Sequence, residues 1–255
     1  MNTEKYIDEI EALLEKAAKD LDARIKVLVS KLESRSGVLI GGELELNRAI
    51  MMRTEIAREM ALYTMESEVA VQALEQAARD SAAHMKTLGI ASEFTQSDVE
   101  LVKAMQQNVR AEIASASISA QAGITEAIYV GVVTGRKQTD LLADITQLLI
   151  GQTDRRGNPM VNHAKTIFRT GYMEVDAVVQ RKKAGDAGIT KFKYIGGTVR
   201  DSRQWCIDHL DGVYTEDQIK AWEGQQWAGK KAGDPFVVRG GWSCMHQFRA
   251  YIEEV

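Results

Sequence analysis

Two cysteines and two histidines in the C-terminal quarter of the chain are the residues whose types and spacing could do chemistry. Cys206 and His209 lie three positions apart, and Cys244 and His246 lie two positions apart. The first spacing puts both side chains on one side of a helix, and the second puts both on one face of a strand. Thiolates and imidazoles are the usual ligands of structural zinc. The four residues therefore predict a structural zinc site, although the second pair is closer together than zinc ligands commonly are.

The same cysteines allow two other interpretations. A disulfide between Cys206 and Cys244 would stabilise the fold by about 4 kcal/mol in the chain-entropy model, but it would have to form outside the reducing cytosol. Alternatively, both thiols stay reduced and pack with tryptophans. All four tryptophans of the chain lie between Tyr194 and His246. A domain this small buries little surface and often needs a metal ion or a disulfide to be stable. The sequence alone leaves all three interpretations open.

An enzymatic reading uses the polar residues of the same region. An acid/base or phosphate-binding constellation, as in a small nuclease, would be drawn from Asp201, Arg203, His209, Asp211, Arg239 and His246. The sequence contains no phosphate-binding glycine loop, nucleophile elbow or H-E-x-x-H motif, the spacings that would support such chemistry. We therefore expect no enzymatic activity, and keep a small nuclease acting on phage or host nucleic acid as the alternative.

Long helices must position this region, because apolar residues recur every three or four positions through most of the chain before it. The pattern predicts helices over 3–33, 44–88, 97–134, 140–150 and 159–184. Glycines at 37, 41 and 42 separate the first two, since glycine clusters interrupt helices. The third is expected to open on a capping box formed by Ser97 and Glu100.

The region after residue 188 reads as a small α+β module. Strands are expected at 191–195, 236–238 and 245–252, from alternation and β-branched or aromatic residues. Short helices are expected after a cap at Asp201 or Ser202, and after a capping box formed by Thr215 and Gln218. The predicted fold class is mostly α, a long N-terminal helical bundle or stalk followed by this module. The predicted domains are 1–150, a connecting helix and hinge at 151–188, and 189–255.

Charge is distributed unevenly between the two parts. Residues 1–150 carry a net charge of −7 and residues 151–255 carry +3, which together give the chain's −4. The acidic part is a poor binder of nucleic acid, whereas the mildly basic part could contact phosphates. No uninterrupted apolar run approaches the roughly 18 residues that cross a bilayer, and the N-terminus lacks a signal peptide's features. We therefore expect a cytosolic product without a membrane partner.

The ordered motifs of the C-terminal region resemble a known family, the minor head or head morphogenesis proteins of tailed bacteriophages (the Mu F-like group). The matching segments are K-T-I-F-R-T at 165–170, D-S-R-Q-W-C at 201–206 and P-F-V-V-R-G-G-W-S-C-M-H at 235–246. The resemblance covers about residues 160–250. Each segment alone is common, and their combined order is what makes the resemblance specific.

The resemblance implies a virion protein made in the host cytoplasm. It implies a structural minor capsid role, inside the head near the portal, in head assembly and in DNA packaging or ejection. Its partners would be the portal protein, the major capsid or scaffolding protein, and packaged DNA through the basic C-terminal part. Many relatives carry further cysteines that suggest a metal cluster. Here Cys206, Cys244 and His246 match the motif and His209 matches it more loosely. Because this chain has only two cysteines, the resemblance by itself does not imply a bound metal, and a structural zinc remains one of the three interpretations above.

Overall fold

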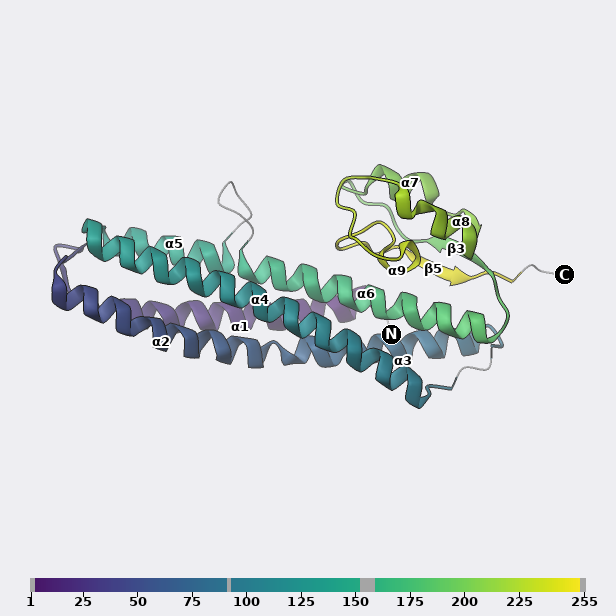
Figure 1. Ribbon diagram of the computed structural model, residues 1–255, viewed down its shortest axis with the longest axis horizontal. Helices are drawn as coiled ribbons and strands as arrows, with labels where there is room; N and C mark the ends of the chain where they lie inside the picture. Colours follow the sequence, from purple (N-terminus) through teal and green to yellow (C-terminus); the bar gives the residue numbers. More distant parts are fainter. Residues whose placement is uncertain (1–2, 91–92, 152–158, 253–255) are drawn as a thin grey trace. The chain divides into compact units, whose positions relative to one another are not determined.

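The computed structural model describes residues 3–90, 93–151 and 159–252 and divides into two compact units. We call Asn2–Val71 with Arg110–Lys165 the bundle unit, and Gln72–Val109 with Thr166–Val255 the module unit. Long helices followed by a small C-terminal module with a few strands confirm the predicted fold class (Figure 1). The compact units have different bounds from the predicted domains, since residues 189–255 share a unit with helical segments.

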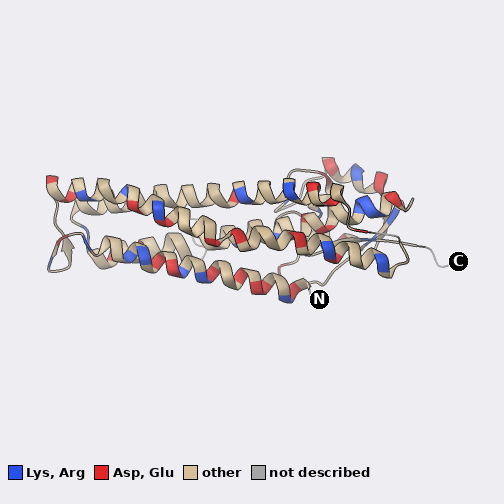
Figure 2. Cartoon of the chain, turned by 90° about the horizontal axis from the view of Figure 1, so that it is seen from below, with Lys and Arg blue, Asp and Glu red and all other residues tan. Residues whose placement is uncertain are grey.

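The bundle unit is built from α1 (Thr3–Val29), α2 (Glu43–Glu66), the C-terminal part of α4 (Gln96–Thr134) and α5 (Gln138–Ile150). Its helices lie side by side in Figures 1 and 2. The apolar stripe expected on the first helix is buried, as at Leu14 and Leu21. The shared core includes Ile25, Ile56, Tyr63, Ile124, Ile128, Leu141 and Ile145. A two-stranded hairpin, β1 (Ser34–Arg35) with β2 (Val38–Leu39), occupies the predicted glycine-rich break.

The helix predicted over 44–88, which is long enough to be either one bundle element or bent, is divided in the structure. α2 ends at Glu66 and α3 runs from Glu68 to Thr87. Ser67 separates them, and its hydroxyl donates a hydrogen bond of 2.8 Å to the Tyr63 carbonyl oxygen. The Ser67 backbone N–H donates to the same carbonyl oxygen at 2.9 Å, and serine side chains that bond back in this way often bend helices. The apolar periodicity continues across Ser67, so the pattern alone did not reveal the break.

The module unit combines parts of α3, α4 and α6 (Met160–Asp186) with a three-stranded antiparallel sheet in the order β4-β3-β5. The strands are β3 (Lys191–Ile195), β4 (Val213–Thr215) and β5 (Gln247–Ala250). Tyr194 pairs with Phe248 across β3 and β5, and both side chains are buried. The strands expected at 191–195 and within 245–252 are therefore confirmed, with the latter shortened to four residues.

Four short helical segments complete the module: α7 (Gln204–His209), α8 (Glu216–Lys220), the 3-10 helix η1 (Ala221–Gly224) and α9 (Pro235–Val238). The Thr215–Gln218 capping box is confirmed at the start of α8.

The strand expected at 236–238 is wrong, because this segment is α9. Asp234 accepts a hydrogen bond from the Phe236 backbone N–H, and Pro235 begins the helix, which are both favoured features of a helix N-terminus. The expected cap of α7 is also wrong. Arg203 occupies that position without a side-chain cap, while the Ser202 hydroxyl accepts from the Val199 N–H.

α4 begins at Gln96, so the predicted capping box at Ser97 is replaced by contacts of Thr95 with Asp98. The Thr95 backbone N–H donates to Asp98 Oδ2 at 2.7 Å. Asp98 is fully buried, and it also accepts hydrogen bonds from Lys182 and Lys183 near the end of α6. Lys183 is itself buried and donates to the Glu93 carbonyl oxygen at 2.6 Å. This buried ion cluster connects the start of α4 to the end of α6.

The cluster predicts a loss of stability in acid. Burial opposes ionisation of Asp98, but the hydrogen bonds from Lys182 and Lys183 outweigh it and hold the pKa of this carboxyl well below its usual range. A depressed pKa stabilises the fold fully above the unfolded-state value of about 3.9, and this contribution is lost as the pH falls below it. Urea unfolding at a series of pH values should therefore show the chain losing stability below pH about 4. An equally steep loss in an Asp98→Asn variant would contradict this assignment.

α4 is also long and mostly apolar over part of its length. Among the described residues, it is the one helix whose length and composition would allow it to cross a membrane. Its window of 18 residues has a mean hydropathy of 1.2 and is 39% buried. Core helices of globular proteins meet the same test, so this finding is weak evidence for a membrane. The helix contains no long uninterrupted apolar run, because serine, glycine and glutamine are interspersed with its apolar residues.

Candidate metal centre

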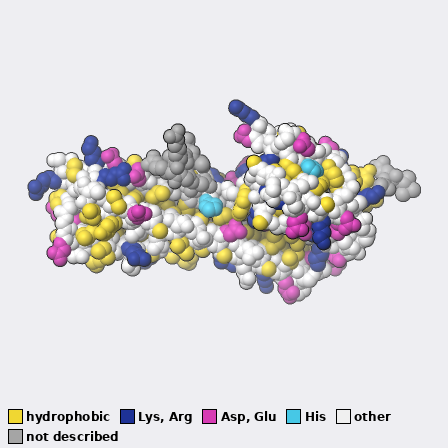
Figure 3. Space-filling view, turned by 45° about the horizontal axis from the view of Figure 1, so that its top comes forward, with side chains coloured by type: hydrophobic (Ala, Val, Ile, Leu, Met, Phe, Trp, Pro, Cys, Tyr) yellow, Lys and Arg dark blue, Asp and Glu magenta, His cyan; other side chains and the backbone are white. Residues whose placement is uncertain are grey.

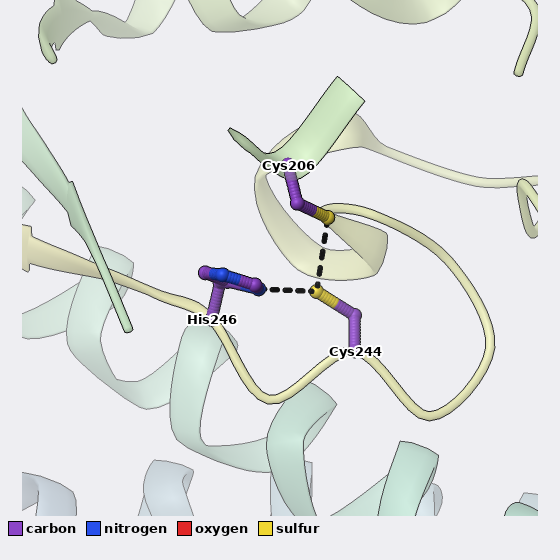
Figure 4. A group of neighbouring side chains, drawn as sticks. All are labelled: Cys206, Cys244 and His246. Carbon is purple, nitrogen blue, oxygen red and sulfur yellow. Dashed lines mark hydrogen bonds between the residues drawn. The ribbon is translucent and has the colours of Figure 1, made fainter. Parts of the chain in front are cut away.

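Three of the four predicted ligands meet in the module unit (Figure 4). Cys206 comes from α7, Cys244 from the turn after α9, and His246 from the residue before β5. The two sulfurs lie 4.0 Å apart, and Cys244 Sγ lies 3.6 Å from His246 Nδ1. One ligand atom from each residue lies within 4.8 Å of the others, and all three side chains are buried. This group could hold a metal ion.

The distances can be compared with those that zinc requires. A tetrahedral zinc ion, bound at about 2.3 Å to sulfur and about 2.0 Å to nitrogen, holds two sulfurs about 3.8 Å apart and a sulfur and a nitrogen about 3.6 Å apart. The observed separations of 4.0 and 3.6 Å are close to both values. The other ring nitrogen of His246, Nε2, is buried and has no hydrogen-bond partner among the described residues. The donor types and two of the three separations between ligand atoms therefore fit a metal.

The cysteines are free thiols in this structure. Their Sγ–Sγ distance of 4.0 Å is about twice the bonded length of roughly 2.05 Å. The arrangement thus differs from the disulfide interpretation, and both sulfurs remain available as ligands.

Tyr194 is a fourth member of the site that the sequence prediction missed. Its hydroxyl oxygen lies 3.6 Å from each sulfur. Its ring stacks on the His246 ring, with centroids 5.3 Å apart and an interplanar angle of 12°. The alternation at 191–195 predicted the strand that carries Tyr194, but no spacing rule connects Tyr194 to Cys206 or Cys244. It adds a polar oxygen beside both thiols in an otherwise apolar core.

The electrostatics of the site favour one thiolate. The Cys206 thiol donates a hydrogen bond to Cys244, and together with His246 and the nearby Arg239 guanidinium it lowers the pKa of Cys244 despite burial. The pKa of Cys206 is raised, chiefly by its hydrogen bond to Cys244 and by burial. The pKa of Tyr194 is raised, chiefly by burial and secondly by the negative charge at Cys244. Cys244 is therefore the sulfur already prepared to bind a cation, since metals bind the deprotonated form.

His209 lies outside this group of ligand atoms. Its Nδ1 is 2.6 Å from the Trp205 carbonyl oxygen, and its ring stacks on Trp205 with centroids 4.3 Å apart. Trp222 packs edge-on against the same imidazole at 4.5 Å. His209 is held by an aromatic cluster. The Cys-x-x-His spacing does put both side chains on one helix, but neighbouring groups engage the imidazole.

The arginines of the nuclease alternative contact backbone carbonyl groups. Arg203 donates to the carbonyl oxygens of Ala228, at 3.1 Å, and Trp242, at 2.6 Å. Arg239 is buried and donates to the Met173 carbonyl oxygen. These contacts fix the loops of the module, which is the structural role that polar residues have in a small domain. The acidic candidate Asp211 forms an exposed ion pair with Lys193 at 3.2 Å.

Gly240 has no side chain, and the sulfurs of Cys206 and Cys244 occupy the space where its Cβ atom would lie. A Cβ atom at this position would lie 2.3 Å from Cys206 Sγ and 2.9 Å from Cys244 Sγ. We expect Gly240→Ala to lower the free energy of unfolding by about 1–3 kcal/mol through overpacking. Denaturant unfolding will measure this change. Gly224→Ala is the matched control, because its Cβ would meet no atom within 4 Å. Equal stability of the two variants would show that the sulfurs can move aside.

Comparisons with known proteins give no match: no family model matches the chain, and no curated protein or solved structure is detectably similar. The fold and the site define a helical-bundle protein with a small α+β module that encloses a buried thiol–imidazole cluster.

Proposed function

We propose that this protein is a structural minor capsid component of a tailed bacteriophage, acting in head morphogenesis near the portal. One observation carries the proposal beyond sequence order: the three motif segments of the resemblance contact one another. The Ser243 N–H donates to Thr170 Oγ1 at 3.0 Å, joining the third segment to the first. Arg203 donates to the Trp242 carbonyl oxygen, joining the third to the second. Residues quoted for the resemblance thus support one another physically.

The helices supply the surfaces with which such a protein would assemble. Large apolar side chains are exposed on them, including Met51 at 73% and Met65 at 71%. Exposed apolar patches on a folded chain commonly mark protein–protein interfaces. Acidic and basic residues are mixed along the helices in Figure 2. We therefore propose protein partners, the portal protein first and then the major capsid or scaffolding protein. Packaged DNA would be a lesser contact, through the basic C-terminal part.

The test is co-purification with the portal protein of the same phage. We expect the two to associate when expressed together, and the protein to be detected by mass spectrometry in purified heads. The tail-tube protein serves as a negative control for the association. Absence of binding to portal and capsid proteins, together with normal maturation and infectivity of particles that lack this protein, would refute the proposal.

We further propose that zinc is the ion at Cys206, Cys244 and His246, and that its role is structural. Two thiols and an imidazole are a donor set that zinc prefers, and the buried location suits a stabilising ion. Elemental analysis combined with thiol counting is the test. We expect about one zinc per chain, and two thiols that react only after chelation. If no metal is found, two reactive thiols in the denatured chain would indicate that both cysteines are reduced and simply packed in the core. No reactive thiols would indicate a disulfide. Either result rejects the zinc proposal.

A further inference from the structure

A groove of about 490 Å³ lies between α2 and α4 in the bundle unit. Its walls are lined by Ala49, Ile50, Arg53, Ile118, Gln121, Ala122, Thr125, Glu126 and Tyr129. The large apolar side chains are well exposed: Ile50 at 55%, Ile118 at 66% and Tyr129 at 48%. The groove therefore presents apolar surface from two helices to the solvent.

These helices are apolar on a second side as well. Met52 and Ile56 of α2 and Ile124 and Ile128 of α4 are buried in the bundle core. Beyond the groove, apolar side chains remain exposed at Leu44, Met51, Val130 and Val133. A helix that is apolar over more than its core stripe is commonly covered on its other side too. Figure 3 shows hydrophobic side chains exposed over the helical region.

The charges of the groove indicate what covers it. Its lining contains one cation and one anion, Arg53 on α2 and Glu126 on α4. None of the ion pairs between described residues includes Arg53 or Glu126. In a two-fold symmetric dimer the same patch of both copies meets. A positive group of one copy must therefore face a negative group of the other. One positive and one negative residue on opposite walls meet that requirement.

We propose that this groove is a homodimer interface, in which it packs against the same groove of a second copy. With the two-fold axis parallel to the helices, α2 of each copy lies on α4 of the other. Arg53 then faces Glu126 of the partner subunit, twice by symmetry. The exposed side chains of Ile50, Ile118 and Tyr129 from both copies fill the hollow between the two ion pairs. This inference rests on the bundle unit alone and does not depend on the proposed function.

Charge reversal combined with mixing tests the proposal. Sedimentation velocity over a concentration series should show a concentration-dependent dimer of the wild-type chain. Arg53→Glu alone and Glu126→Arg alone each place like charges opposite one another at two points. Since like-charge contacts in an interface cost several kcal/mol, we expect each variant to raise the dimer dissociation constant at least about tenfold. An equimolar mixture of the two variants should dimerise again, because every facing pair is then of opposite sign.

Two further variants complete the design. Arg58→Glu is the matched control, since Arg58 is an exposed residue of α2 outside the groove, and it should leave the dissociation constant unchanged. Ile118→Ser should weaken the dimer in the same way as the charge reversals. Circular dichroism will verify that all variants fold. A monomer at every concentration, a dimer insensitive to both charge reversals, or failure of the mixture to recover would each overturn the proposal.

Discussion

Replacing Asp98 by asparagine is expected to lower the free energy of unfolding by about 3–5 kcal/mol, the usual cost of removing one partner from a buried ion pair. The carboxylate of Asp98 accepts hydrogen bonds from Lys182 and Lys183, and Lys183 is only 4% exposed. Asparagine is almost the same size but leaves the buried ammonium of Lys183 without a counter-ion. Denaturant unfolding followed by circular dichroism will measure the change.

The matched control is Glu100→Gln, which neutralises an exposed carboxylate near the start of the same helix. Surface substitutions of this kind usually change stability by less than about 0.5 kcal/mol. A second variant, Asp98→Asn with Lys183→Met, removes the uncompensated buried charge and should recover part of the loss. Equal stability of Asp98→Asn and Glu100→Gln would mean that the cluster contributes little in solution.

On the proposal that zinc is bound at this site, replacing Cys244 by alanine is expected to abolish zinc binding and to unfold the module. Structural zinc sites contribute apparent binding free energies of about 10–16 kcal/mol in zinc-finger peptides, so their loss exceeds the stability of a small domain. Trp205, Trp222, Trp227 and Trp242 all lie in the module. Tryptophan fluorescence will therefore report the module selectively, while far-UV circular dichroism reports mainly the long helices. We expect a red-shifted emission with most of the helical signal retained.

His209→Gln is the control for this experiment. The structure places His209 against Trp205 and outside the ligand group, so this variant should keep about one zinc per chain. Zinc content of both variants will be measured by elemental analysis. Loss of zinc from His209→Gln would restore the predicted four-ligand set. Full zinc content in Cys244→Ala would remove Cys244 from the site.

The sequence predicted the long helices well, because burial of one face imposes a period that is visible in the residues themselves. It did not predict the interruption at Ser67, because the apolar periodicity continues across this residue. It also assigned 236–238 to a strand. Three apolar residues in a row are compatible with a strand or a helix. Here the Asp234 cap and Pro235 at the first position favour a helix.

The candidate site was predicted in part. The spacings identified Cys206, Cys244 and His246, since sulfur and imidazole are recognisable by type. They could not show that the Trp205 carbonyl engages His209, or that Tyr194 approaches both sulfurs. Those facts depend on how distant segments pack together. The groove between α2 and α4 was missed for the same reason, because periodicity shows that a helix is apolar but does not show which of its faces stays uncovered.

The ion cluster at Asp98 also constrains the order in which the chain can fold during synthesis. Lys183 follows Asp98 by 85 positions, and Asp176 follows its hydrogen-bond partner Ser81 by 95. Contacts this distant in sequence form slowly, because a long loop must close before they stabilise anything. The contacts of Asp98 with Lys183 and of Ser81 with Asp176 can therefore form only after α6 has been synthesised. Until then these polar groups of segment 72–109 stay hydrated.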